Sequence, residues 1–208
     1  MTLDYGALTR ACDAVGISPE RGWLAAIEVH LRLLEKWSEK MNLTSVKEPQ
    51  EALVRHIVDS LALLRLTTLG LVRGPVLDVG SGAGFPGIPL AIARSDWTFT
   101  LLEPRQKRGI FLDRVIAEAG LKNARWREGR LPDPALNGRF QLVVSRATLA
   151  PDELLSAATP TLAQGGIVAI MAAEAPWTEA PAGFQDLESH HFELGGARRY
   201  VGCVRRSG

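Results

Sequence analysis

The chain has 208 residues, 46% of them hydrophobic, and a formal net charge of +1. This length suits one α/β domain with an extra segment, or one large domain, and the composition allows a sizeable core. Two cysteines, Cys12 and Cys203, stand near opposite ends of the chain and exclude a disulfide framework, so we expect a cytoplasmic protein. The first ten residues lack a signal-peptide pattern and no apolar run could span a bilayer, so we expect no membrane partner.

Helical patterns dominate residues 1–74. We predict a short helix over 3–15, and a second helix with Ser18 as its cap and Pro19 at its first position. The second helix carries apolar residues at the spacing of one helical face: Leu24, Ile27, Leu31, Leu34 and Trp37. A third helix is predicted over 50–66.

Strand and helix patterns alternate in residues 75–208. Strands are predicted at 75–79, 98–102, 124–127, 140–145 and 166–172, and helices at 86–94, 105–119 and 151–163. Short crossovers of this kind require parallel neighbouring strands. Two β segments, 185–194 and 198–205, are predicted to form a terminal hairpin around Gly195 and Gly196. We therefore expect an α/β core at 75–208, with the helical segment 1–74 packed on it.

Charge is distributed unevenly along the chain. Residues 75–150 contain eleven basic and seven acidic side chains, whereas 151–197 contain seven acids and no lysine or arginine. This asymmetry predicts a basic face, which is compatible both with nucleic-acid binding and with an ordinary solvated surface.

The most informative segment is a strand that runs directly into a glycine-rich turn. Val76 to Val79 is followed by Gly80, Gly82 and Gly84, and then by a predicted helix. Glycines allow the backbone to approach a ligand closely, because no Cβ stands in the way and positive φ is permitted. The helix directs its amide groups and positive dipole end into the same space. The pattern predicts a nucleotide-like ligand on this turn.

Two interpretations of the turn compete. Gly82, Gly84 and Gly87 satisfy G-x-G-x-x-G, and Glu103 lies near the offset expected for a ribose-binding acid in an NAD-type oxidoreductase. The period-two glycines, the acid Asp78 before them and the terminal hairpin fit class I S-adenosylmethionine-dependent methyltransferases better. In that fold, which is Rossmann-like, Glu103 would accept both ribose hydroxyls at the end of the second strand.

Sequence elements along almost the whole chain extend this second interpretation. They are Trp37, Asn42-Leu43-Thr44, Arg55-His56 with Asp59-Ser60, the run from Asp78 to Leu90, Lys107-Arg108 with Phe111-Leu112, and Ser145-Arg146-Ala147. In these elements the chain resembles the bacterial small-subunit (16S) ribosomal RNA guanine-N7 methyltransferase family, also called glucose-inhibited division protein B. The Phe85-Pro86-Gly87-Ile88-Pro89 continuation of the glycine turn and the Arg-His-x-x-Asp-Ser element are specific to this family.

The resemblance implies S-adenosylmethionine as the cofactor. It assigns Phe85, which follows the last glycine, to the cofactor site beside Gly80, Gly82, Gly84 and Glu103. It also implies backbone contacts to the adenine from the loop after the third strand, which reads Arg130-Leu131-Pro132 here. Because Pro132 cannot donate a backbone hydrogen bond, we assign the contact to Leu131 with its neighbour Arg130.

The resemblance further implies transfer to guanine N7, and the residue chemistry agrees. The fourth strand ends in Ser145-Arg146-Ala147 and not in the Asn/Asp-Pro-Pro-aromatic motif of exocyclic-amine methylation, and it carries no nucleophilic cysteine. Guanine N7 is a lone pair with no proton to remove, so we expect no general base. Arg146, which also borders the cofactor, and Arg55 with His56 would instead hold the reactants in position. On a regular helix Arg55 and Asp59 would share a face.

We expect a monomer that binds small-subunit ribosomal RNA or the small ribosomal subunit, with Arg55, Lys107, Arg108 and Arg127 meeting phosphates. The alternative for these side chains is an ordinary charged surface. No metal is predicted, because the remaining histidines and Cys203 lack ligand spacing. Two alternatives stay open: an NAD-type dinucleotide-binding oxidoreductase, and a non-catalytic RNA-binding ribosome-assembly factor.

Overall fold

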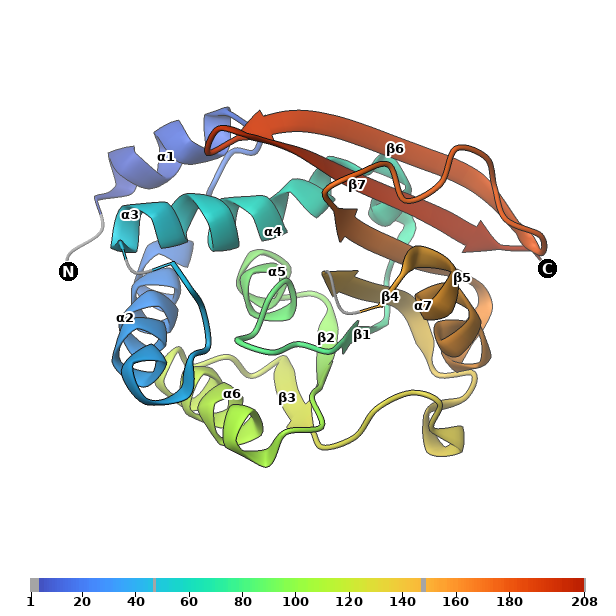
Figure 1. Ribbon diagram of the computed structural model, residues 1–208, viewed down its shortest axis with the longest axis horizontal. Coiled ribbons are helices and arrows are strands. Elements are labelled where there is room, and N and C mark those ends of the chain that lie inside the picture. The colour runs from blue at the N-terminus through green and yellow to red at the C-terminus, as the bar shows by residue number, and fades with distance from the viewer. Residues whose placement is uncertain (1–3, 47, 147–148, 208) are drawn as a thin grey trace.

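The computed structural model describes residues 4–46, 48–146 and 149–207 (Figure 1). Its centre is a sheet with strand order β3-β2-β1-β4-β5-β7-β6. The strands are β1 (Pro75–Val79), β2 (Thr98–Leu102), β3 (Ala124–Arg127), β4 (Phe140–Arg146), β5 (Leu162–Ala172), β6 (Phe184–Leu194) and β7 (Ala197–Arg206). β1 to β5 run parallel to one another, whereas β7 pairs antiparallel with both β5 and β6. The predicted α/β sheet that ends in an antiparallel hairpin is confirmed.

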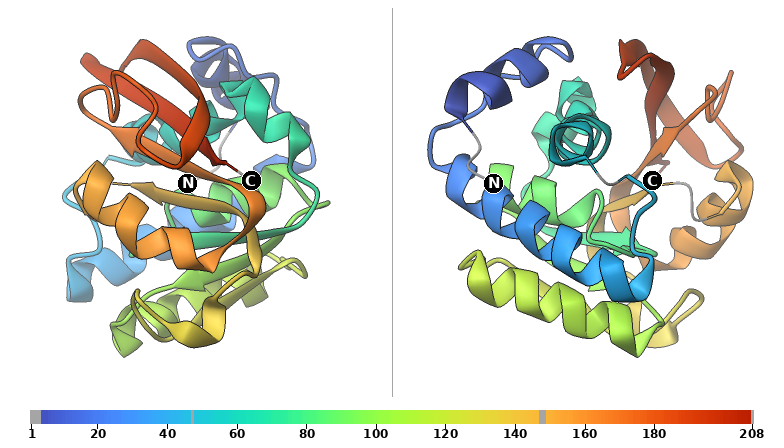
Figure 2. Two further views of the ribbon diagram at one scale, coloured as in Figure 1. Left: turned by 90° about the vertical axis from the view of Figure 1, so that its right-hand side faces the viewer. Right: turned by 60° about the vertical axis from the view of Figure 1, so that its left-hand side comes forward.

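The helices cover the two faces of the sheet unequally. α5 (Gly87–Ala93) and α6 (Gln106–Glu118) lie on one face, together with the N-terminal helices, around a cluster that includes Phe99, Leu101 and Phe111. α7 (Pro151–Ala158) lies on the opposite face, over a second cluster that includes Leu77 and Leu102 (Figure 2). Each helix is slightly shorter than predicted, and α7 ends in a 3₁₀ turn at Thr159–Thr161.

The hairpin turn has the geometry that its sequence predicts. Gly195 and Gly196 both adopt positive φ, +58° and +76°. Consecutive positive φ values match the twist of two antiparallel strands, and glycine reaches them without a Cβ penalty. The turn thereby fixes the pairing of Leu194 with Ala197.

The start of the second helix differs from the prediction. α1 (Tyr5–Asp13) is capped by Asp4, whose carboxylate accepts from the Gly6 amide, but α2 (Trp23–Met41) begins well after Ser18 and Pro19. The Tyr5 hydroxyl donates to the Pro19 carbonyl oxygen at 2.6 Å. This tertiary contact lies in a turn before α2, so the predicted Ser18 cap is wrong.

The third predicted helix is helical throughout but irregular. It comprises α3 (Pro49–Ala52), a π-helical turn (Leu53–Val58), α4 (Asp59–Leu61) and a 3₁₀ turn (Ala62–Arg65). A π-helical turn inserts an extra residue and frequently marks a functional site. Arg55 pairs with Glu51 at 3.0 Å, at the i,i+4 spacing of a regular helix, and Asp59 is 5% exposed. Arg55 and Asp59 line the same pocket, although Arg55 is exposed and Asp59 is buried.

None of the helices in the described part of the chain is long and apolar enough to cross a membrane.

Candidate functional site

The glycine turn lies between β1 and α5, at the carboxyl ends of the central parallel strands. Gly80, Gly82 and Gly84 have φ values of +71°, +57° and +89°. At Gly84 a Cβ would also stand 2.6 Å from the Ile88 side chain. The Gly80 amide donates to the Leu102 carbonyl at 2.9 Å, which binds the turn to the end of β2. A side chain at these positions would strain the turn and obstruct the approach to its backbone.

Glu103 organises the turn from the end of β2. Its side chain is 3% exposed, and its two oxygens accept from the Gly82 amide at 3.0 Å and the Arg105 amide at 2.9 Å. Arg108, on the first turn of α6, places a guanidinium nitrogen 4.0 Å from the same carboxylate. Glu103 therefore presents an oriented negative charge beside the glycine turn, where a ligand hydroxyl can donate to it.

Asp78 supports the glycine turn from β1, the strand that precedes it. It is fully buried on β1, and one carboxylate oxygen accepts from the Gly87 amide at 3.0 Å, at the start of α5. Burial raises the pKa of the Asp78 carboxyl to about 7, against the lowering effect of the bonds from Ser81 and Gly87. This residue holds the turn to the helix and has no access to a ligand.

Phe85 forms the centre of an aromatic stack that joins both parts of the chain. Its ring lies between His30 of α2, at 4.7 Å, and His56 of the π-helical turn, at 4.8 Å. The Arg146 guanidinium lies over the same ring, 4.8 Å from its centre. His30 Nε2 lies 2.8 Å from the Ala83 carbonyl oxygen. Because a carbonyl only accepts, Nε2 carries the proton, and His30 thus anchors the glycine turn to the N-terminal segment.

Both nitrogens of the His56 ring are engaged. Nδ1 lies 3.1 Å from the Arg55 carbonyl and 3.4 Å from the Arg146 guanidinium; because the carbonyl contact is the shorter and a carbonyl only accepts, we assign the proton to Nδ1. Nε2 then accepts from the Thr44 hydroxyl at 2.7 Å, and that hydroxyl accepts from the Val46 amide. Burial, followed by the charge of Arg146, lowers the pKa of His56 to about 4. The ring is neutral near pH 7, and its hydrogen bonds fix its orientation in the pocket lining.

Asp59 links two arginines from distant strands. One carboxylate oxygen lies 3.7 Å from Arg146 at the end of β4, and the other lies 3.8 Å from Arg199 on β7. Asp59 is 5% exposed, and burial raises the pKa of its carboxyl while both arginine charges act in the opposite direction. The three side chains form a charged cluster at the carboxyl edge of the sheet.

Two adjoining pockets share His56 and Arg146 in their linings. The first, about 160 Å³, is lined by the glycine turn together with Thr44, Phe85 and Arg108. The second, about 310 Å³, is lined by Arg55, Asp59, Met171 and Arg199, among others. Two ligands bound in these pockets would therefore meet at the side chains of His56 and Arg146.

Comparison with known proteins identifies the family. The family model described as rRNA small subunit methyltransferase G matches residues 24–196. The chain belongs to this family. Ribosomal RNA small subunit methyltransferase G of Alkalilimnicola ehrlichii is 39% identical over 85% of this chain and 78% of its own length. The Nitrosomonas europaea protein of the same name is 42% identical, over 61% of this chain and 58% of its own length.

The fold comparison agrees with the family. The structure of a precorrin-6y C5,15-methyltransferase from Geobacter metallireducens superimposes with a TM-score of 0.53, covering 72% of this chain and 87% of that one. At 14% identity this likeness concerns the fold, which is that of class I S-adenosylmethionine-dependent methyltransferases. The cofactor of the family is S-adenosylmethionine, and the comparisons do not support the NAD-type alternative.

The residues present fit that cofactor. The glycine turn leaves its backbone open where a Cβ would obstruct a ligand, and the Glu103 carboxylate beside Gly82 suits a ribose diol. Phe85 and the first pocket lie at the same turn. Of the predicted site residues, Gly80, Gly82, Phe85, His56 and Arg146 line this one pocket.

Other predicted residues lie outside this pocket. Lys107 is exposed beside the groove between α2 and α6. Arg127 pairs with Asp133 at 2.7 Å, and Arg130 is exposed in the following loop. Leu131 packs against the hydrophobic cluster under α7. The structure therefore does not gather the four predicted phosphate-binding residues into one patch, and Arg108 lines the first pocket.

Sequence reasoning missed two residues of the site. His30 falls on the apolar face of α2, where a fully buried histidine signals a specific hydrogen bond. Arg199 lies on the terminal hairpin, far from the motifs in sequence, and only the fold brings it to Asp59. Within the described residues, no group of histidine, cysteine, aspartate or glutamate side chains could hold a metal ion.

Proposed function

We propose that this protein transfers a methyl group from S-adenosylmethionine to N7 of one guanine in small-subunit ribosomal RNA. The observation that carries the proposal is the pair of adjoining pockets with His56 and Arg146 in both linings. The first pocket has the glycine turn of the family, and the second is lined by arginines. Bound S-adenosylmethionine supplies the electrophilic methyl group.

The side chains between the pockets suit an acceptor that loses no proton. His56 uses both ring nitrogens in hydrogen bonds, and burial keeps the ring neutral, so it is poorly placed to act as a base. Arg146 remains a cation and can only donate. Guanine N7 attacks through an existing lone pair, so positioning alone is needed, and proximity can contribute about 7–11 kcal/mol in favourable cases.

The charged cluster complements a guanine base. Guanine presents O6 as an acceptor and its N2 amine as a donor. The guanidinium groups of Arg146 and Arg199 can donate to O6, while the Asp59 carboxylate between them can accept from the amine. Adenine would place a donor against the arginines, so the cluster favours guanine. Arg55, at the entrance of the second pocket, would meet a flanking phosphate.

The partner and setting follow from this activity. We assign small-subunit ribosomal RNA, free or within the subunit, as the partner, and the cytoplasm as the compartment. We further propose that the protein acts as a monomer.

The test is to incubate purified protein with small-subunit ribosomal RNA and S-adenosylmethionine and to map 7-methylguanine by chemical cleavage. Arg146→Ala should lose methyl transfer by more than its loss of RNA affinity explains, whereas Arg198→Ala, an exposed arginine on the hairpin, is the matched control. Methylation at an amine, at a ribose hydroxyl or at no site would refute the proposal. Normal transfer by Arg146→Ala would remove its positioning role.

A further inference from the structure

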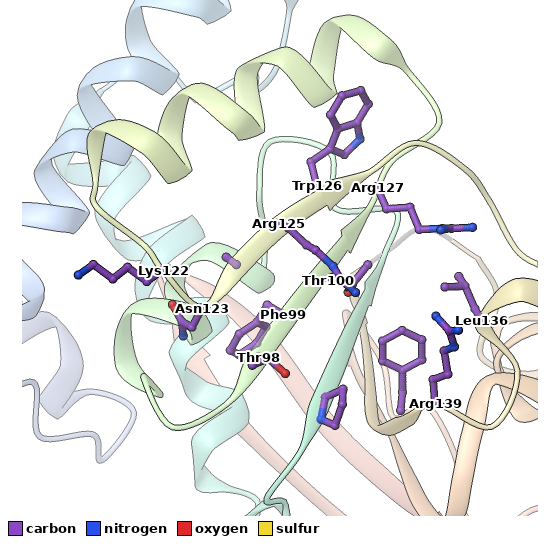
Figure 3. A pocket seen from close by; sticks show the side chains of 13 residues that line it. Thr98, Phe99, Thr100, Lys122, Asn123, Arg125, Trp126, Arg127, Leu136 and Arg139 are labelled. Carbon is purple, nitrogen blue, oxygen red and sulfur yellow. The ribbon is translucent and has the colours of Figure 1, made fainter.

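One face of the sheet is left uncovered beside the edge strand. The connection from β3 to β4 contains only a 3₁₀ turn, Pro134–Leu136, so no helix of the described chain lies over β2 and β3 on the α7 side (Figure 1). Thr98 and Thr100 alternate with the inward residues of β2 and point to this side, as does Leu102 in the cluster under α7. A cleft of about 860 Å³ occupies the uncovered face (Figure 3).

The lining of this cleft is strongly basic. Four cations border it: Lys122, Arg125, Arg127 and Arg139. Asp133 neutralises Arg127 at 2.7 Å, and its pKa is lowered mainly by that bond. In the described part of the chain, no carboxylate lies within ion-pair distance of the other three. Arg125 is exposed and makes only a long contact, 3.4 Å, to the Thr100 hydroxyl.

The cations are arranged along a line and not around a point. Arg125 and Arg127 stand two residues apart on β3, a separation of about 6.6 Å along a strand. Arg139 rises from the opposite wall beside Leu136, and Lys122 extends at the far end of β3 (Figure 3). A single small anion would be held by converging donors, whereas this spacing suits successive phosphates of one strand.

The cleft also lacks surfaces on which bases could stack. Phe99 and Phe140 are 2% and 3% exposed, and the Trp126 ring packs on the other side of β3, against Gly109 of α6. At the Arg127 end of the cleft, the Arg127 carbonyl accepts from the Glu103 amide at 3.2 Å, so this end lies beside the strand end that carries Glu103.

We infer that this cleft, defined by Lys122, Arg125, Arg127 and Arg139, binds the sugar-phosphate backbone of a ribosomal RNA segment outside the target nucleotide. The inference rests on the proposed function for the identity of the RNA. The argument is charge complementarity: phosphates can neutralise Lys122, Arg125 and Arg139, which have no carboxylate at ion-pair distance within the described residues, and such contacts are independent of sequence. The cleft fixes the orientation of the RNA, while the two pockets select the base.

The test compares two double variants of equal charge. Arg125→Ala with Arg139→Ala removes cleft cations, and Arg10→Ala with Arg198→Ala removes exposed cations from α1 and β7. Binding of a fluorescent small-subunit RNA fragment is titrated from low to moderate salt. The cleft variant should bind at least tenfold more weakly, with a slope of log affinity against log salt shallower by about 1.4–1.8, since each lost contact contributes about 0.7–0.9.

Two further readouts separate this inference from the proposed function. S-adenosylmethionine affinity should be unchanged in the cleft variant, and methyl transfer should recover the wild-type rate at saturating RNA. If wild-type protein methylates the RNA but both variants bind it alike, the inference is overturned and the proposed function stands. If the cleft variant loses RNA binding but the wild type methylates no guanine N7, the cleft stands and the function fails.

Folding and an alternative ligand are controlled in the same experiment. Arg125→Gln with Arg139→Gln keeps polar side chains on the same exposed positions and should reproduce the loss of RNA affinity.

Polyglutamate serves as the probe for an acidic protein. If the cleft variant binds RNA as the control does but loses polyglutamate binding, the surface docks a protein and the RNA inference is wrong.

Discussion

His30 should make the stability of this protein depend on pH in a way that one substitution removes. The ring is fully buried, its Nε2 donates to Ala83, and its Nδ1 has no hydrogen-bond partner within the described residues. A proton on Nδ1 would place a charge between Phe85 and Phe111. Burial accordingly lowers the pKa of His30 from 6.5 to about 4, and the charge of Arg146 adds to the effect.

The sign and size of this pH dependence follow from the linkage between proton binding and folding. Because the pKa of the folded state lies below that of the unfolded chain, the contribution is complete above about pH 6.5 and is lost as pH falls to about 4. The lowering of the His30 pKa by about 2.5 corresponds to a loss of about 3.4 kcal/mol in the free energy of unfolding once the pH is well below 4. Between pH 7.5 and pH 5.0 the same two values give a loss of about 2 kcal/mol.

The assay compares urea unfolding at these two pH values for wild type and His30→Gln. Glutamine can still donate to the Ala83 carbonyl but does not titrate. On acidification, the unfolding free energy of the variant should therefore fall by about 2 kcal/mol less than that of wild type. Asp78 acts in the opposite direction, because its raised pKa of about 7 costs stability as pH rises, and His56 acts as His30 does. Both are present in every variant and cancel in the difference.

The control is His191→Gln, which removes an exposed histidine of β6. Its change in unfolding free energy between the two pH values should equal that of wild type. If His30→Gln also retains the full wild-type loss on acidification, the imidazole is not held neutral by burial and the reasoning is refuted.

Three further predictions concern the cofactor, the chemistry and the packing. Glu103→Ala should weaken S-adenosylmethionine binding at least tenfold by calorimetry, since each charge-assisted bond contributes about 1.5–3 kcal/mol; unchanged affinity would show that Glu103 does not hold the ribose. Single-turnover transfer at saturating substrates should vary little between roughly pH 6.5 and 8.5, and a log-linear rise would indicate an acceptor that must lose a proton. Gly109→Ala should destabilise the fold by about 1–3 kcal/mol in urea, because the new Cβ would stand 2.0 Å from the Trp126 ring. Gly70→Ala, with no atom within 4 Å, should be close to neutral.

The sequence predicted the sheet better than the helices of the N-terminal segment. β1, β2 and β3 have the predicted bounds, because buried apolar runs between turn residues leave few alternatives. The π-helical turn at Leu53–Val58 was not predicted, since its apolar spacing is that of an ordinary helix and packing decides the extra residue. Likewise the Ser18 cap failed because Tyr5 holds Pro19 in a turn, a contact that local sequence does not encode.

The site shows the same division between local and non-local causes. The glycine turn and Glu103 were predictable, because a strand followed by glycines and an acid at the next strand end is a local pattern. Arg146 was predictable from its place at the end of β4. The link from Asp59 to Arg199 was not, since it depends on the antiparallel hairpin that places β7 beside β5.

The boundary near residue 74 separates two sequence patterns, but residues on both sides of it contribute to the candidate site. His30, Thr44 and His56 come from the N-terminal segment, and they anchor or line the glycine turn of the α/β core. One hydrophobic cluster contains residues of both parts, Ile27 and Ile88 among them. A core at 75–208 produced alone would lose the stacking partners of Phe85 and the His30 anchor of Ala83. The helical segment therefore lines the pocket at the glycine turn, and we expect its removal to abolish S-adenosylmethionine binding even where the sheet itself still folds.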